Sequence, residues 1–173
     1  FDDALQRARG QAEGYARACG KPGVVLVTSG PGATNTITGI MTAHMDSVPM
    51  VVITGQTISP MLGKDAFQEA DVFGLTMPVV KHSYLIKNSN DIPRIVKEAF
   101  HIAQTGRPGP VVIDMPKDVQ EAKVKLWFSD KINLPGYKPE MPARVDQMEE
   151  ALKLILAAKR PVLYVGGGII SAE

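Results

Sequence analysis

Short apolar runs rich in β-branched residues constrain the fold of this chain more than any other feature. Two are clear, Val-Val-Leu-Val at residues 24–27 and Met-Val-Val-Ile at residues 50–53. Each is bounded by Gly, Pro or Ser, as expected for strands buried on both faces of a parallel sheet. Residues 79–80 and 111–113 are similar and predict two further strands.

Helical patterns lie between these runs. The clearest covers residues 91–105, with Pro93 near its start and Gly106 just after its end. Its apolar residues fall on one face: Ile92, Ile95, Val96, Ala99 and Ala103. The alternation of strands and helices predicts an α/β fold, a doubly wound parallel sheet with helices on both faces.

The pattern divides the chain into three segments. Residues 1–119 form the first α/β domain, and residues 120–144 read as a linker because Pro and Gly interrupt the periodicity. Residues 145–173 start a second α/β domain. Its first helix contains Leu152 and Ile155, and its first strand, residues 161–165, runs into a triple glycine.

Composition narrows the class of protein. The chain has 19 basic and 18 acidic residues in no sustained stripe, which argues against nucleic-acid binding. No apolar run approaches the roughly 20 residues that span a bilayer, and no signal peptide is visible. The lone Cys19 cannot pair within the chain, so a reducing, cytoplasmic location is expected. The chain opens without Met inside a helical pattern, which suggests missing upstream residues.

A glycine-rich turn, Ser-Gly-Pro-Gly-Ala-Thr-Asn at residues 29–35, follows the first strand and precedes a helical pattern. Such a turn brings backbone N–H groups close to a ligand at the carboxyl end of a sheet. It also serves as a plain tight connection in which Gly relieves backbone strain. The motif matches neither the phosphate-binding P-loop nor the dinucleotide fingerprint, so both interpretations stay open.

Several motifs together resemble one enzyme family. They are TSGPGATN at 28–35, DAFQE at 65–69, VKHS at 80–83, GRPGPV at 106–111 and PKD at 116–118. This set is similar to the large, catalytic subunit of acetohydroxyacid (acetolactate) synthases, and the likeness covers residues 11–171. TSGPGATN and GRPGPV are common to many thiamine-diphosphate enzymes, whereas DAFQE, VKHS and PKD are more specific.

The resemblance implies a domain that binds the pyrimidine half of thiamine diphosphate. Pro31, Asn35 and Gln68 match positions that line this cofactor site. Asn35 could instead be a helix residue bonded to its own backbone, and Gln68 a solvated loop residue.

The resemblance also implies substrate and flavin contacts. Phe67 and Lys117 match positions facing the substrate channel, where a lysine can pair with a 2-oxo acid carboxylate. Phe67 could instead be an ordinary packing residue, and Lys117 a solvated lysine at the end of a strand. Arg107 and Gly167 match contacts to FAD, a flavin without redox function here. Arg107 could instead interact with helix carbonyls, and Gly167 belong to an ordinary turn.

The sequence departs from the family at its essential glutamate. Counting back from Glu13 places that position on Leu5, which cannot accept a hydrogen bond, so no catalytic residue is assigned. Three explanations compete: a truncation or cloning artefact, a diverged or misread N-terminus, and a carboligase resembling glyoxylate carboligase, which works with an apolar residue at this position.

No metal site is predicted within this chain. The family binds Mg²⁺ with the diphosphate through a GDG motif in another domain, and no such motif occurs here. His44, His82 and His101 are spaced in a way that supports no shared metal. Asp114 and Asp118 give no sign of forming an acid/base pair.

The resemblance implies a parent enzyme of branched-chain amino-acid biosynthesis that decarboxylates pyruvate on thiamine diphosphate and condenses it with a second 2-oxo acid. It implies a homodimer or tetramer with the site between subunits, a possible regulatory small subunit, and, in a eukaryote, a plastid or mitochondrion. This chain alone is expected to be inactive. Another thiamine-diphosphate carboligase or oxidase, such as glyoxylate carboligase or pyruvate oxidase, and a non-catalytic folding or assembly unit are the alternatives.

Overall fold

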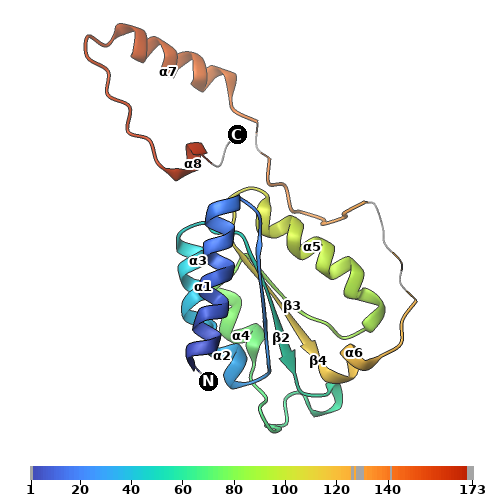
Figure 1. Cartoon of the computed structure of the whole chain (residues 1–173). Coiled ribbons are helices and arrows are strands. Elements are labelled where there is room, and N and C mark those ends of the chain that lie inside the picture. The colour runs from blue at the N-terminus through green and yellow to red at the C-terminus, as the bar shows by residue number, and fades with distance from the viewer. Residues whose placement is uncertain (1, 126, 128–130, 141, 171–173) are drawn as a thin grey trace. The chain divides into compact units, whose positions relative to one another are not determined.

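The structure is a computed structural model that describes residues 2–125, 127, 131–140 and 142–170 (Figure 1). Its internal contacts divide the chain into two units, Phe1–Pro135 and Gly136–Glu173. The boundary falls inside the segment predicted to be a linker. Each unit is described by itself.

The first unit contains the sheet. Its strands are β1 (Gly23–Val27), β2 (Met50–Gln56), β3 (His82–Leu85) and β4 (Pro110–Pro116). Its helices are α1 (Asp2–Cys19), α2 (Pro31–Thr34), α3 (Ile37–Met45), α4 (Val72–Thr76), α5 (Ile92–Gln104) and α6 (Lys117–Glu121), with 3-10 turns η1 (Ser59–Met61), η2 (Met77–Val79) and η3 (Ser89–Asp91). The helix predicted at residues 91–105 is therefore confirmed as α5.

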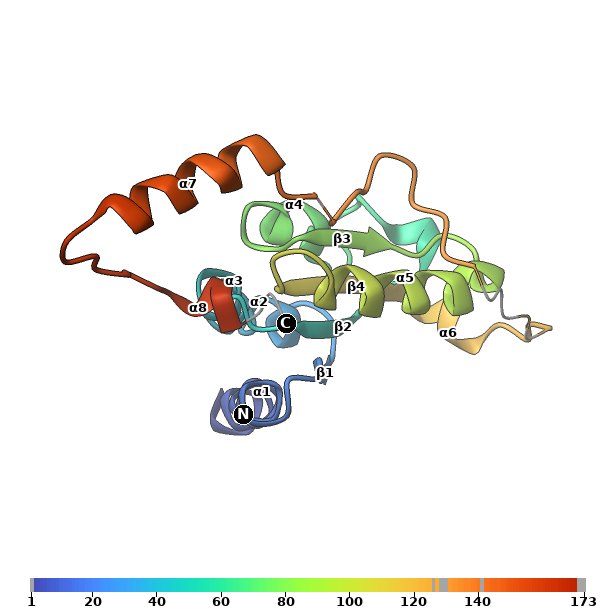
Figure 2. The same cartoon turned by 90° about the horizontal axis from the view of Figure 1, so that it is seen from above.

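The four strands pair in the order β1-β2-β4-β3, and every pair is parallel. Figure 2 shows them following one another across the sheet in this order. Val25, Val52 and Val112 are partners in register across three strands. The predicted α/β fold with a parallel sheet is confirmed.

Helices cover both faces of the sheet (Figure 1). On one face, Val25, Val52 and Val112 share a buried core with residues of α1 and α3, among them Ala16 and Ile40. The alternate residues of the strands point to the other face, where α5 packs against β4 and β2. This side of α5 is buried at Ile95, Ala99, Ile102 and Ala103.

Two strand predictions need correction. Residues 79–80 are not a strand: η2 ends at Val79, and β3 begins at His82. Pro78 lacks a backbone N–H and fixes φ, which favours the turn. The run at residues 24–27 is a strand but is buried on one face only, because β1 lies at the edge of the sheet and leaves Val24 50% and Leu26 74% exposed.

The second unit contains α7 (Val145–Ala157) and α8 (Gly167–Ile170). Helix α7 confirms the predicted amphipathic helix. The strand expected at residues 161–165 is not formed, and the described part of this unit offers no strand for it to pair with. An isolated strand leaves its backbone groups unpaired, which explains the difference. No described helix has the length and hydrophobicity needed to cross a bilayer.

Close packing of α1 on β1 generates a stability prediction. A Cβ on Gly23 would lie 2.1 Å from the backbone oxygen of Ala12, so Gly23→Ala must push α1 off the sheet. We expect a loss of about 2–3 kcal/mol in the free energy of unfolding, measured by urea denaturation. Gly14→Ala, in the same helix with nothing within 4 Å, is the control and should stabilise by about 0.5–1 kcal/mol. Equal effects of the two substitutions would contradict this packing.

Candidate functional site at the carboxyl ends of the strands

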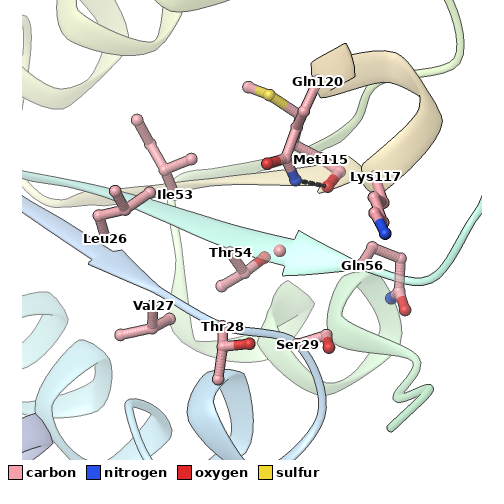
Figure 3. Close-up of a pocket in the computed structure, with 11 residues that line it drawn as sticks. Leu26, Val27, Thr28, Ser29, Ile53, Thr54, Gln56, Met115, Lys117 and Gln120 are labelled. Atoms are coloured by element: carbon pink, nitrogen blue, oxygen red, sulfur yellow. Dashed lines mark hydrogen bonds between the residues drawn. The ribbon is translucent and has the colours of Figure 1, made fainter. Parts of the chain in front are cut away.

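A pocket of about 710 Å³ opens where β1, β2 and β4 end (Figure 3). Its lining combines apolar side chains with hydroxyl, amide and ammonium groups: Leu26, Val27, Thr28, Ser29, Ile53, Thr54, Gly55, Gln56, Met115, Lys117 and Gln120. The carboxyl edge of a parallel sheet is where α/β proteins bind their ligands. No carboxylate is among these described lining residues.

The glycine-rich turn lies beside this pocket and contacts the loop that contains Gln68, which comes later in the sequence. Gly30 has φ 55° and ψ −114°, a conformation that glycine adopts readily and other residues do not. A Cβ at Gly30 would be 2.7 Å from the backbone oxygen of Gln68 and 3.0 Å from its Cα. The backbone of Gln68 therefore lies directly against the turn that leads into Pro31.

The loop that carries Gln68 holds an unusual backbone conformation. Asp65 has φ 51° and Gln68 has φ 55°, in the left-handed region that costs a non-glycine residue about 1 kcal/mol or more. Phe67, between them, is 88% exposed. Such strain persists only where the surroundings determine the backbone, and it is concentrated at functional sites.

Glu69 holds one part of this loop. Its carboxylate accepts hydrogen bonds from the backbone N–H groups of Gly63, Lys64 and Ala66, the last at 2.9 Å. These bonds, led by that of Ala66, lower the pKa of Glu69 below its usual value. The side chain thus stays ionised and closes the loop on itself.

A buried polar network ties the end of the loop to the sheet. The Nε2 of Gln56 donates to the carbonyl of Ala70 at 2.7 Å and to Oδ2 of Asp114 at 2.9 Å. The hydroxyl of Thr54 donates to Oδ1 of Asp114 at 2.7 Å. Because Thr54 and Asp114 are register partners on β2 and β4, the network bridges two strands and a loop.

Burial raises the pKa of Asp114 to about 6. The hydrogen bonds from Thr54 and Gln56 oppose this rise, and the negative charge of Asp71 adds to it. Asp118 differs: it is exposed, and it accepts bonds from the backbone N–H of Ser59 at 2.9 Å and from its hydroxyl at 3.1 Å. The bond from the Ser59 backbone is the main cause of a lowered pKa at Asp118. The two aspartates thus have separate partners.

Lys117 follows β4 and reaches the pocket from the start of α6. Its Nζ lies 3.7 Å from Oε1 of Glu121, and both side chains are 68% exposed. An exposed ion pair of this kind contributes little free energy, so it competes weakly with a ligand carboxylate for the lysine.

Comparison with known proteins decides the family. Residues 6–75 match the sequence profile described as thiamine pyrophosphate enzyme, N-terminal TPP binding domain. The chain is 57% identical over 168 residues to the acetolactate synthase large subunit of Corynebacterium glutamicum, covering 97% of this chain and 27% of that protein. The acetolactate synthase large subunit of Haemophilus influenzae is 54% identical over 170 residues, with 97% and 30% covered. The acetolactate synthase isozyme 3 large subunit of Escherichia coli is 52% identical over 169 residues, with 96% and 29% covered.

The chain belongs to the acetolactate synthase large-subunit family. It spans less than a third of the length of these relatives. The family membership predicted from the TSGPGATN, DAFQE and PKD motifs is confirmed.

The structure brings together only some of the residues that the likeness to acetolactate synthases singles out. Pro31 begins α2 next to the Gln68 backbone, and Asn35 ends the same short helix, exposed, with its backbone N–H on the carbonyl of Pro31. Lys117 lies at the same edge of the sheet. The side chain of Leu5 lies outside what the structure describes.

Arg107 lies at the other end of the strands, just before β4 begins. Its guanidinium donates to the hydroxyl of Ser47 at 2.8 Å and to the carbonyls of His44 and Met45 at 3.2 and 2.9 Å. These carbonyls end α3, so Arg107 interacts with a helix carboxyl end as its sequence context suggested, although on a different helix. Gly167 begins α8 in the second unit.

Sequence reasoning missed Thr54, Gln56 and Glu69 in this acetolactate synthase domain, and it considered Asp114 only as a member of an acid/base pair. Thr54 and Gln56 lie near the carboxyl end of the apolar strand β2, and Asp114 lies in the second half of the apolar strand β4. Buried polar side chains at such positions are costly unless they are paired. That position is the signal that could have identified them. Among the described residues, no group of three or more His, Cys, Asp or Glu side chains could hold a metal ion.

The contact of Gly30 with Gln68 predicts a position-specific loss of stability. Gly30→Ala should lower the free energy of unfolding by about 2–4 kcal/mol, because it adds a clash to an unfavourable φ. Gly63→Ala is the matched control, since Gly63 has φ +75° but nothing within 4 Å, and it should cost about 1 kcal/mol. Urea denaturation measures both, and equal losses would argue against the close approach.

The raised pKa of Asp114 predicts how stability depends on pH. In the folded chain the Asp114 carboxyl has a pKa of about 6, whereas the usual pKa of an aspartate is 3.8. The stability contributed by protonation is therefore complete below pH 3.8 and is lost as the pH rises through about 6. The free energy of unfolding of Asp114→Asn, taken relative to that of wild type at the same pH, should rise by up to about 3 kcal/mol from pH 4 to pH 7. Urea unfolding at each pH measures this difference. A difference independent of pH would contradict the raised pKa.

Proposed function

We propose that this chain is part of an acetolactate synthase large subunit, which decarboxylates pyruvate and condenses it with a second 2-oxo acid. The observation that carries the proposal is the 52–57% identity to large subunits over nearly the whole chain. We assign to this segment the pyrimidine half of thiamine diphosphate, with residues 1–119 as the domain, 120–144 as the linker and 145–173 as the start of the next domain.

The described residues fit a pyrimidine ring. Its ring nitrogens and amino group need both donors and acceptors, and the amide of Gln68 offers both. The ring of Pro31 offers an apolar surface, and the exposed Asn35 supplies a second amide. The acid that the family uses against this ring corresponds to Leu5, so the described part of the chain does not provide it.

Thiamine diphosphate, when bound, would supply a carbon nucleophile and an electron sink for the decarboxylation of a 2-oxo acid. The residues of this chain bind and orient. Lys117 pairs with the substrate carboxylate, and Phe67 forms an apolar wall beside it. Leu26, Ile53 and Met115 in the lining keep water away from the reacting groups.

Further partners follow from the same proposal. Arg107 and Gly167 contact FAD, which has no redox role, and a domain outside this chain binds the Mg²⁺. Arg107 fits an anionic group because its guanidinium is exposed and held in place by Ser47 and α3. The enzyme would be a homodimer or tetramer with the site between subunits, with a regulatory small subunit, in the cytoplasm, or in a plastid or mitochondrion of a eukaryote.

Substitution of the proposed substrate residues tests the proposal in the full-length protein. Lys117→Met should raise the KM for the 2-oxo acid roughly ten-fold, because it removes a charge-assisted hydrogen bond. Phe67→Ala should impair use of the second 2-oxo acid more than decarboxylation of the first. Steady-state kinetics with pyruvate and 2-oxobutyrate provide both measurements. Lys123→Met, an exposed lysine outside the pocket, is the control.

The products distinguish this function from its alternatives. Acetolactate formed from pyruvate supports the proposal. Acetyl phosphate as the main product, or turnover of glyoxylate alone, would identify another thiamine-diphosphate enzyme. No turnover with full cofactor binding would favour a non-catalytic role. Unchanged kinetics in both Lys117→Met and Phe67→Ala would count against the substrate assignments.

A further inference from the structure

The loop between β2 and α4, residues 57–71, is anchored by three carboxylates. Asp118 holds its beginning through Ser59, and Glu69 closes its middle on the N–H groups of Gly63 and Ala66. Asp114 holds its end through Gln56, which reaches the carbonyl of Ala70. Of these three, Asp118 is exposed, Glu69 is partly buried, and Asp114, 2% exposed, is fully buried.

Asp114 has both carboxylate oxygens occupied by side-chain donors, Thr54 and Gln56. The second N–H of the same Gln56 amide goes to Ala70, and its oxygen accepts the backbone N–H of Thr57 at 2.9 Å. The orientation of the amide is therefore fixed on all sides. If the carboxylate is removed, one donor of Gln56 loses its partner and the amide is free to turn away from Ala70.

The carbonyl of Ala70 sits two residues beyond Gln68, whose backbone has an unfavourable φ and lies against Gly30. It also accepts the N–H of Val72 at 2.8 Å, at the start of α4. A strained backbone of this kind relaxes unless its neighbours fix it. The bonds of Glu69, next to Gln68, stay within the loop, whereas the bond from Gln56 to Ala70 ties the carboxyl side of Gln68 to the sheet.

We propose that Asp114 is a positioning residue that acts through Gln56 to hold the Ala66–Asp71 loop, so that Gln68 stays against the Gly30–Pro31 turn. Asp114 does not line the pocket and is not a catalytic residue. Its consequence for thiamine diphosphate rests on the proposed function, in which Gln68 and Pro31 bind the pyrimidine ring. The effect on the loop itself does not depend on that function.

Amide hydrogen exchange on the full-length protein tests the proposal. Asp114→Asn should speed exchange of the Ala66, Glu69 and Val72 amides roughly ten-fold or more, because a charge-assisted bond to the network is lost. Exchange in β2 and β4 should stay unchanged. The apparent affinity for thiamine diphosphate should fall about ten-fold, while kcat at saturating cofactor changes less than about three-fold, as expected for lost positioning rather than lost chemistry.

Asp118→Asn is the matched control, because it releases the other end of the loop. It should speed exchange near Ser59 and Met61 and leave Ala66–Val72 as in wild type. Thr54→Val removes one donor to Asp114 and should produce a smaller rise in the same Ala66–Val72 segment, whereas Thr54→Ser should retain wild-type exchange. Thr54→Val gives the answer if Asp114→Asn does not fold.

The outcomes separate the two proposals. Unchanged exchange at Ala66–Val72, or an equal rise throughout the sheet, would overturn the positioning role of Asp114. Faster exchange confined to the loop, with unaltered affinity for thiamine diphosphate, would support the positioning role and contradict the assignment of Gln68 to the cofactor. Both changes together support both proposals.

Discussion

Parallel pairing of β1, β2 and β4 is the constraint on which the rest of the structure depends. Because these strands run the same way and in register, the residues that follow them meet at one edge of the sheet. That edge gathers Ser29, Gln56 and Lys117 from segments far apart in the sequence. A shift of β4 by one residue against β2 would place Asp114 on the face opposite to Thr54 and remove their bond.

The buried hydrogen bonds among Thr54, Gln56 and Asp114 determine the structure at this edge of the sheet. Apolar packing alone would hold the strands together without determining the path of the loop above them. A buried carboxylate is costly unless its oxygens are satisfied, so Asp114 tolerates only the arrangement in which Thr54 and Gln56 both donate to it. Through Gln56 the requirement extends to Ala70. The loop beside the pocket therefore takes its shape from a polar group inside the sheet.

The sequence predicted what depends on local pattern. The apolar runs at residues 50–53 and 111–113 became β2 and β4, which are buried along nearly their whole length. The amphipathic helix at 91–105 became α5, which buries one helical face. The strand at 79–80 failed because Pro78 outweighed two β-branched residues, and that at 161–165 because a strand needs a partner. The Gln56–Asp114 network was missed because it joins residues 58 apart, which no periodicity reveals.

The two ends of β4 carry different cations. Arg107 precedes the strand and Lys117 follows it, and the strand's seven residues, at about 3.3 Å each, separate its two ends by roughly 20 Å. Arg107 donates to Ser47 and the last carbonyls of α3, whereas Lys117 forms a weak, exposed ion pair with Glu121. An anion at Arg107 therefore also affects the packing of α3, while an anion at Lys117 lies beside the pocket.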